Sequence, residues 1–278
     1  MKNNKSPCIG FLGLAALTLM AVAVPATAQT ILLNGDFETG DFTSWSASGA
    51  SIRAGITGGS TYAGLAPGGG YEIAQTRSTA GIGTPSNFTL DFYFAAGLPP
   101  VAGKNSFEAA ILYQGDQAKG WLNVGVTDLT GSGTIGDLWA YDGTTRTVLF
   151  VDSVAYSTDI GGGSEVINTY RVRFTLDSIA GTWDVGLSSL GGSTFTQTAF
   201  NQSIWRTNPS VSGFTNPTSL EVKLIGGATG GPPAQQGLGI FDDVYLGSAM
   251  AVPEPSSLAL FGIAAAFVLW RKRRPFLS

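Results

Sequence analysis

The chain has 278 residues, including 39 glycines, one cysteine and no histidine, with 19 acidic and 15 basic side chains and a net charge of −4. Without histidine, the sequence excludes a Ser-His-Asp triad, a Cys-His dyad and any metal site with imidazole ligands. The acidic balance also argues against a nucleic-acid partner, because phosphate binding needs a basic face.

The N-terminus has the three parts of a secretory signal peptide. Two lysines precede an apolar stretch over Ile9–Val24, and an Ala-Thr-Ala cleavage site ends at Ala28. We therefore expect residues 1–28 to engage the Sec export machinery and to be removed; the alternative is an uncleaved membrane helix. The only cysteine, Cys8, lies inside this segment, so the exported product would have no disulfide and no thiol.

Residues 29–248 form the expected body, in which apolar and polar residues alternate along many segments. In Phe88–Phe94 and in Tyr170–Leu176 every second residue is apolar, which is the period of a strand with one buried face. Residues Tyr141–Thr144 have the sequence Tyr-Asp-Gly-Thr, which is typical of a tight turn between two hairpin strands. No stretch of the body shows ten residues of clean helical period. The pattern predicts an all-β fold, an antiparallel jelly-roll β-sandwich.

Residues 131–136 have the Gly-x-Gly-x-x-Gly spacing of a dinucleotide-binding fingerprint. That fingerprint needs a strand before it and a helix after it, so that phosphates meet a helix N-terminus. Because a strand pattern follows at residues 137–141, we interpret the segment as a glycine-rich turn.

Short motifs stand at both ends of the body. Asn34–Trp45 opens it, Ile240–Leu246 closes it, and Tyr170–Leu187 between them reads as a strand, a glycine turn and a second strand. Together these motifs resemble carbohydrate-binding jelly rolls, both the galactose-binding-like modules and the concanavalin-A-like lectin and glucanase domains. The resemblance implies that the first and last strands lie side by side.

Acidic residues stand in both terminal motifs, Asp36 and Glu38 in the first and Asp242 and Asp243 in the second. The resemblance implies that these four meet at a seam where related modules hold a structural calcium ion, which prefers oxygen ligands. The alternative is that Asp36 and Asp41 are turn residues and that one aspartate of the second motif faces water. No other cofactor is expected.

Glycoside hydrolysis needs two carboxylates about 5–9 Å apart. Glucanases of the concanavalin-A-like group carry them on one strand in a closely spaced Glu-x-Asp-x-x-Glu pattern, which does not occur here. The glutamates of the body stand singly in different segments: Glu38, Glu72, Glu108, Glu165 and Glu221. The sequence therefore predicts no enzyme, with a secreted glycoside-active enzyme as the alternative if carboxylates from separate strands converge.

Sugar binding uses exposed aromatic faces that stack on pyranose rings. Trp121 and Trp205 stand in polar surroundings and are the candidate ligand-binding residues. Trp183 lies in an alternating strand and is predicted to be in the core. Core packing is the competing interpretation for any single aromatic residue, because large rings dominate the interior of β-sandwiches.

The C-terminus, residues 249–278, joins a short linker to a three-part pattern. Pro253, Glu254 and Pro255 precede an apolar segment over residues 256–270. A basic cluster follows: Arg271, Lys272, Arg273 and Arg274. As a helix, the run from 258 to 270 would span about 20 Å, less than the ~30 Å hydrocarbon core, and the cations should stay on the cytoplasmic side. By itself this pattern predicts a short transmembrane helix that anchors the chain.

The order Pro-Glu-Pro, apolar helix, basic cluster and chain end resembles the PEP-CTERM sorting signal of Gram-negative bacteria. The resemblance implies that exosortase, a membrane-embedded cysteine transpeptidase, recognises Pro253–Pro255 and removes the helix, so the inner membrane holds the chain only transiently. Loss of both ends leaves 9 of the 15 cations against 18 or 19 carboxylates. The exported body is therefore more acidic than the whole chain.

These features predict an exported protein of the cell surface or extracellular matrix of a Gram-negative bacterium. The expected role is non-catalytic, as a structural or glycan-binding component of the exopolysaccharide layer, with extracellular polysaccharide as a partner. A glycan-binding module predicts an exposed aromatic platform, a purely structural protein predicts buried aromatic residues, and an enzyme predicts two converging carboxylates. The alternative for its location is a single-pass membrane anchor that exosortase does not process.

Overall fold

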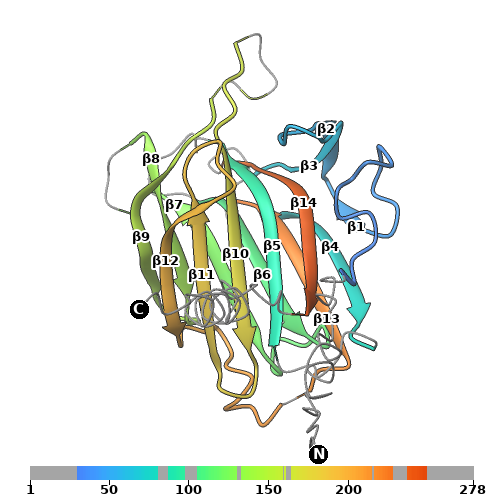
Figure 1. Ribbon diagram of the computed structural model, residues 1–278, viewed down its shortest axis with the longest axis vertical. Coiled ribbons are helices and arrows are strands. Elements are labelled where there is room, and N and C mark those ends of the chain that lie inside the picture. The colour runs from blue at the N-terminus through green and yellow to red at the C-terminus, as the bar shows by residue number, and fades with distance from the viewer. Residues whose placement is uncertain are drawn as a thin grey trace, which may run out of the picture. The chain divides into compact units, whose positions relative to one another are not determined.

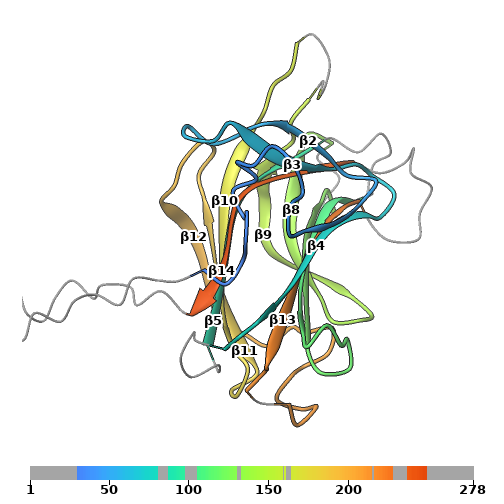
Figure 2. The same ribbon diagram turned by 90° about the vertical axis from the view of Figure 1, so that its right-hand side faces the viewer.

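Fourteen β-strands make up the regular structure of the residues that the computed structural model describes. These residues are 30–80, 87–97, 105–129, 133–158, 160, 164–214, 216–227 and 237–248. The strands pair antiparallel into two seven-stranded sheets, which Figure 2 shows as two facing layers. The predicted all-β jelly-roll sandwich is therefore confirmed. The predicted signal peptide and sorting region lie outside the described residues, among which no helix could cross a membrane.

The first sheet has the strand order β1-β4-β13-β6-β7-β8-β9. Its strands are β1 (Ser46–Ser48), β4 (Tyr71–Ser78), β6 (Asn105–Tyr113), β7 (Trp121–Thr127), β8 (Ile135–Tyr141), β9 (Arg146–Ala155) and β13 (Ser219–Gly226). Strands β6 to β9 follow one another along the chain and pair in that order, whereas β13 inserts between β4 and β6 from far along the chain.

The second sheet has the strand order β12-β11-β10-β5-β14-β3-β2. Its strands are β2 (Ser51–Ala54), β3 (Tyr62–Ala66), β5 (Asn87–Ala96), β10 (Thr169–Asp177), β11 (Thr182–Ser188), β12 (Phe195–Gln202) and β14 (Gly239–Ser248). In Figure 1, β12, β11, β10, β5 and β14 run side by side. The last strand, β14, thus lies in the middle of its sheet, between β5 and β3.

Aromatic side chains from both sheets meet in the core. The inward residues of β5 are at most 1 % exposed: Phe88, Leu90, Phe92 and Phe94. The ring of Phe94 lies 4.7 Å from that of Phe107 on the first sheet. Trp183 is also buried, and its indole donates to the Ile204 carbonyl at 3.0 Å. The predicted strand alternation and the predicted core position of Trp183 are confirmed.

The predicted turn between β8 and β9 is also present. Asp142 Oδ1 accepts hydrogen bonds from the amides of Thr144 and Thr145 at 2.7 and 2.6 Å. Gly143 has a φ of +97°, which a residue with a Cβ rarely adopts. Upstream, the glycine-rich segment leads into strand β8 rather than a helix, as predicted, although residues 131 and 132 lie outside the described part of the chain.

Candidate functional site

The first segment of the body lies alongside its last strand. The Ile31 amide donates to the Leu246 carbonyl at 2.7 Å. Farther along, the Val244 amide donates to the Gly35 carbonyl at 2.8 Å. These bonds bring the acidic residues of the two terminal motifs to one seam, although the first strand itself, β1, pairs in the other sheet and not with β14.

At this seam, Glu38 and Asp242 hold the loop between β2 and β3. Glu38 Oε1 accepts hydrogen bonds from the amides of Thr61 and Tyr62 at 2.6 and 3.1 Å. The Ser60 hydroxyl lies between the two carboxylates, 2.9 Å from Glu38 Oε1 and 3.1 Å from Asp242 Oδ1. The donors, with the Tyr62 amide foremost, lower the pKa of Glu38. The two carboxylates therefore act as acceptors that fix this loop.

The other two acidic residues of the seam differ in their surroundings. Asp36 Oδ1 accepts the Glu38 amide at 3.3 Å, in a local turn. Asp243 has a φ of +48° at the bulge that interrupts the pairing of β14 with β5. Desolvation, followed by repulsion from Asp36 and Glu38, raises the pKa of Asp243. Desolvation also raises the pKa of Asp242, although the Ile56 amide donates to it at 3.0 Å.

The seam offers no ready set of ligands for the expected calcium ion. Across the described ranges, no group of three or more acidic side chains could hold a metal ion. Calcium takes about six to eight oxygen ligands, whereas Glu38 and Asp242 already accept hydrogen bonds from the loop. Asp41, like Asp36, is a turn residue, since its Oδ1 accepts the Thr43 amide at 2.9 Å. Calcium binding stays a prediction, and the alternative interpretation of Asp36 and Asp41 describes the structure better.

The expected exposure of Trp205 is wrong. Its side chain is only 5 % exposed, and its indole donates to the Gly181 carbonyl at 2.8 Å. Its ring packs edge-on against Tyr113, with centroids 6.2 Å apart. Its sequence neighbours Ser203 and Arg206 are exposed, whereas Trp205 itself is buried. Polar neighbours in the sequence were therefore a misleading sign of exposure. A ring that is buried in this way offers no face to a sugar.

Trp121, the other candidate, begins β7 and is half-exposed. The chain at 205–207 runs beside it, with the Arg206 amide donating to the Trp121 carbonyl at 2.9 Å. This pairing places the Arg206 guanidinium 3.6 Å from the centroid of the Trp121 ring and 5.3 Å from that of Tyr141. The Trp121 indole nitrogen is buried and has no hydrogen-bond acceptor in the described part of the chain.

Trp121 belongs to the side of the first sheet that faces away from the core. We call this surface the β7 face, and its residues are Glu108, Trp121, Asn123, Trp139, Tyr141, Arg146 and Arg206. Gly125, paired with Glu108 on one side and Trp139 on the other, leaves room for the Trp139 indole, since a Cβ there would overlap that ring. Arg146 covers Trp139 at 4.7 Å from its ring. The face therefore carries two indoles, each with a guanidinium group over it: that of Trp121 is half-exposed, whereas that of Trp139 is fully buried.

Glu108 lies at the base of the β7 face and is 7 % exposed. The amides of Asn105 and Asn123 donate to its two carboxylate oxygens at 2.6 and 3.2 Å. Burial raises the pKa of Glu108, against the effect of these amides and of Arg146 and Arg206. The carboxylate is therefore held in place by amides and is easier to protonate than a glutamate in water.

Sequence reasoning missed most of the β7 face. Glu108 appeared as one of several isolated glutamates, because its partner Asn123 comes from the next strand and meets it only through the register of β6 and β7. One feature of the sequence could have indicated this cluster of buried polar residues. Asn105, Glu108 and Asn123 interrupt segments that are otherwise apolar, and polar residues that are buried in strands need partners.

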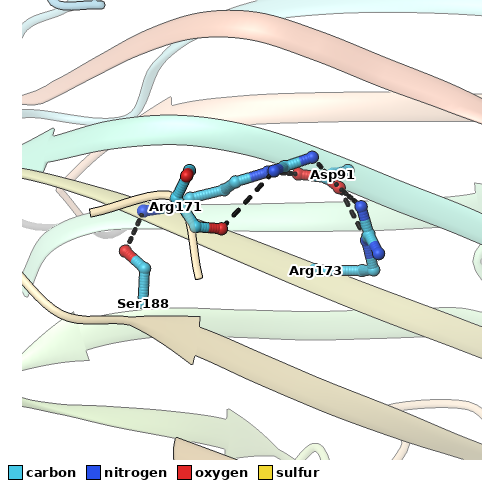
Figure 3. Close-up of polar contacts among 5 residues, drawn as sticks. Asp91, Arg171, Arg173 and Ser188 are labelled. Atoms are coloured by element: carbon cyan, nitrogen blue, oxygen red, sulfur yellow. Dashed lines mark hydrogen bonds and ion pairs between the residues drawn. The ribbon is translucent and has the colours of Figure 1, made fainter. Parts of the chain in front are cut away.

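A second polar cluster lies on the outer side of the second sheet. Asp91 is 3 % exposed and lies between two guanidinium groups, as Figure 3 shows. Arg171 contacts its carboxylate at 2.8 and 2.9 Å, and Arg173 does so at 2.6 Å. The Arg171 amide also donates to the Ser188 hydroxyl at 2.8 Å. Here the charges are paired with one another, so the cluster is a structural link between β5 and β10.

Beside this cluster is a pocket of about 450 Å³. Tyr93 lines it, and the Arg171 guanidinium lies 5.5 Å from the Tyr93 ring. The other lining residues are small, polar or aliphatic: Ile56, Thr57, Gly58, Ile167, Asn168, Thr169, Leu190, Gly191, Gly192 and Ser193. None of the lining side chains is charged, so the pocket gives no charge pattern from which to choose a ligand.

Residues 251–274 match the family described as the PEP-CTERM protein-sorting motif. The chain therefore carries this sorting motif, as its Pro-Glu-Pro, apolar and basic segments predicted. The motif implies export to the cell surface or the extracellular space. The motif residues themselves, from Pro253 to Arg274, lie outside the described part of the structure.

Several solved structures are similar to the body at low identity. The globular domain of T. cruzi calreticulin is 12 % identical, with a TM-score of 0.43, over 85 % of this chain and 98 % of that one. The carbohydrate esterase vb_24B_21 from the Shiga toxin-encoding bacteriophage phi24B is 14 % identical, with a TM-score of 0.47, over 80 % and 99 %. The cellulose induced protein Cip1 is 15 % identical, with a TM-score of 0.43, over 77 % and 96 %. No curated protein matches the sequence.

Proposed function

We propose that this chain is a non-catalytic glycan-binding protein of the bacterial cell surface or exopolysaccharide layer, and that it binds through the β7 face. The sorting motif at residues 251–274 supports the location. The β7 face supports the activity because it combines the half-exposed rings of Trp121 and Tyr141 with the guanidinium groups of Arg146 and Arg206. Those are the groups that orient a sugar by stacking on its ring and bonding to its hydroxyls.

The observation that carries the proposal is the position of Trp121 and Tyr141. Both rings are half-exposed and lie next to each other on the outer side of the sheet, where the Arg206 guanidinium contacts both of them. Asn123, two residues from Trp121 on the same face of β7, is buried and anchors Glu108. A purely structural protein would gain more by burying these rings.

The surroundings of Glu108 favour binding over hydrolysis. A glycosidase needs a second carboxylate about 5–9 Å from the first. The groups that bond to Glu108 are the amides of Asn105 and Asn123, and the charged groups that act on it are Arg146 and Arg206. We therefore assign Glu108 to the support of the binding surface and assign no bond cleavage to it.

The binding test uses the full chain and immobilised polysaccharides, including the polysaccharide fraction of the host's own surface layer. Trp121→Ala should weaken binding about tenfold, since aromatic stacking on the ligand is lost. Phe200→Ala is the matched control, because Phe200 is an aromatic residue 62 % exposed on β12 of the other sheet. Unchanged binding by Trp121→Ala and by Tyr141→Ala, with unchanged melting temperatures, would contradict the proposal.

We also propose that exosortase removes the C-terminal tail near Pro255 while the inner membrane holds the chain. Mass spectrometry of the protein from the surface of its native host should then show no peptide beyond about that residue. Recovery of peptides that contain Arg271–Arg274 from mature surface material would contradict processing. It would favour a permanent membrane anchor.

A further inference from the structure

We infer that the β7 face selects anionic polysaccharides, whose carboxylate or sulfate groups are bound by Arg146 and Arg206. The inference rests on the proposed glycan-binding function and adds the charge of the ligand.

Several other cations on the sheets pair with carboxylates, whereas Arg77 on β4 donates to the Ile31 carbonyl at 3.0 Å. Arg53 contacts Glu165 at 2.8 Å, and Lys223 contacts Glu72 at 3.3 Å. Arg171 and Arg173 share Asp91. By contrast, no described carboxylate lies within 4.0 Å of the guanidinium groups of Arg146 or Arg206. These two arginines lie on indole rings instead of on anions.

Stacking leaves the hydrogen-bond donors of both arginines available. A guanidinium group that lies over a ring keeps its N–H groups in its own plane, so they remain free to form paired bonds with a carboxylate or sulfate. The ring beneath also restricts the side chain, which reduces the entropy lost on binding. Arg206 is exposed and Arg146 is half-exposed, so solvent and ligands can reach them.

Both arginines flank one aromatic residue. Arg146 is the cross-strand partner of Tyr141 in the pairing of β8 with β9. Arg206 lies on the other stacked ring, Trp121, with its guanidinium carbon 5.3 Å from the centroid of Tyr141. A single polymer segment that stacks on Tyr141 could therefore offer anionic groups to both arginines.

The charge of the rest of the body makes this face selective. With 9 cations against 18 or 19 carboxylates after removal of both ends, the body as a whole repels an anionic polymer. Arg146 and Arg206 offer an anionic polymer a local site of attraction, because no described carboxylate lies within 4.0 Å of either guanidinium group. The one carboxylate within this face, Glu108, is buried beneath the arginines and bonded to amides.

The test compares the binding of the full chain to polygalacturonate, dextran sulfate and neutral dextran. We expect at least one anionic polymer to bind about tenfold or more tightly than dextran, and added salt to weaken that binding. Comparing the affinity for polygalacturonate with that for dextran sulfate shows whether the protein recognises carboxylate or sulfate groups. Arg206→Gln should weaken anionic binding about tenfold, because a charge-assisted bond is lost.

The control is Arg53→Gln, because Arg53 is paired with Glu165 on the other sheet and should not affect binding. Arg206→Lys keeps the charge but loses the planar stack, and an intermediate affinity supports the inference. Anionic binding by Arg206→Gln and Arg146→Gln at the wild-type level would overturn it. So would a preference for dextran that depends on Trp121, although that result would leave the proposed function intact. Failure to bind any glycan would contradict both.

Discussion

The guanidinium carbon of Arg206 lies 3.6 Å from the centroid of the Trp121 indole. The two residues are far apart in the sequence, and the backbone pairing of residues 205–207 with the start of β7 brings them together. Because of this contact, the half-exposed ring of Trp121 holds the guanidinium group of Arg206 over its face. The contact also defines the edge of the β7 face.

The Arg206–Trp121 contact should be measurable by itself. In a double-mutant cycle with Arg206→Gln and Trp121→Leu, we expect a coupling of about 0.5–1 kcal/mol in the free energy of unfolding, the usual range for a cation–π contact near the surface. Urea denaturation of the four proteins provides the measurement. A coupling near zero would show that the stack does not form in solution.

Gly125 should tolerate no side chain. Gly125→Ala places a Cβ against the Trp139 ring and the Phe107 carbonyl, so the indole must move and the variant should lose about 1–3 kcal/mol of stability. Glycan binding should fall with it. Gly59→Ala is the control, since nothing lies within 4 Å of a Cβ at that position. Equal stability of both variants would contradict the placement of Trp139.

Asp91 should matter more for stability than any single exposed ion pair. Asp91→Asn leaves Arg171 and Arg173 facing each other without an anion, and we expect a loss of about 2–4 kcal/mol. Glu165→Gln, which breaks the more exposed pair with Arg53, should change stability by only about 0–1 kcal/mol. Thermal and urea unfolding distinguish the two, and a similar small effect for both would argue against the cluster in Figure 3.

Glu108 should make the stability depend on pH. Because burial raises its pKa in the folded state, the folded protein binds this proton more tightly than the unfolded chain does. This contribution is full below the unfolded-state pKa of about 4.3 and is lost as the pH rises through the higher folded-state pKa. Glu108→Gln removes the titrating group, so the variant should gain stability relative to the wild type between pH 4 and pH 7. A difference that is constant or that has the opposite sign would contradict this environment for Glu108.

The seam should be independent of calcium. Glu38 and Asp242 already accept hydrogen bonds from the loop between β2 and β3, so a chelator should leave the melting temperature unchanged. Glu38→Gln should instead increase hydrogen exchange at the amides of Thr61 and Tyr62. A fall of several degrees with chelator that added calcium reverses would support calcium binding by Asp36, Glu38, Asp242 and Asp243.

The strands were predictable where the alternation was local. In β5 and β10, apolar residues at every second position are sufficient to define the buried face. The resemblance to jelly rolls predicted that the first and last strands lie side by side. In the structure the first strand, β1, pairs with β4 in the other sheet, and only the segment before it reaches β14, through the Ile31–Leu246 and Val244–Gly35 bonds. The composition of the core, including Trp183, followed from the same alternation.

The functional surface was predictable only in part, because it depends on register and on long-range pairing. Trp121 was identified from its polar neighbours, but the same reasoning placed Trp205 at the surface, where Tyr113 and the Gly181 carbonyl in fact enclose it. Glu108 meets Asn123 through the pairing of β6 with β7, which no local pattern encodes. Arg206 reaches Trp121 from a segment with no strand period of its own.

Glycan binding through the β7 face is tested most directly by NMR. The indole N–H signals of the tryptophans are followed while oligosaccharides of polygalacturonate, or of the host's surface layer, are added. The signal of Trp121, assigned with Trp121→Phe, should shift with increasing ligand, while those of Trp183 and Trp205 in the core should not. Saturable binding that leaves Trp121 unmoved would contradict the β7 face as the binding surface.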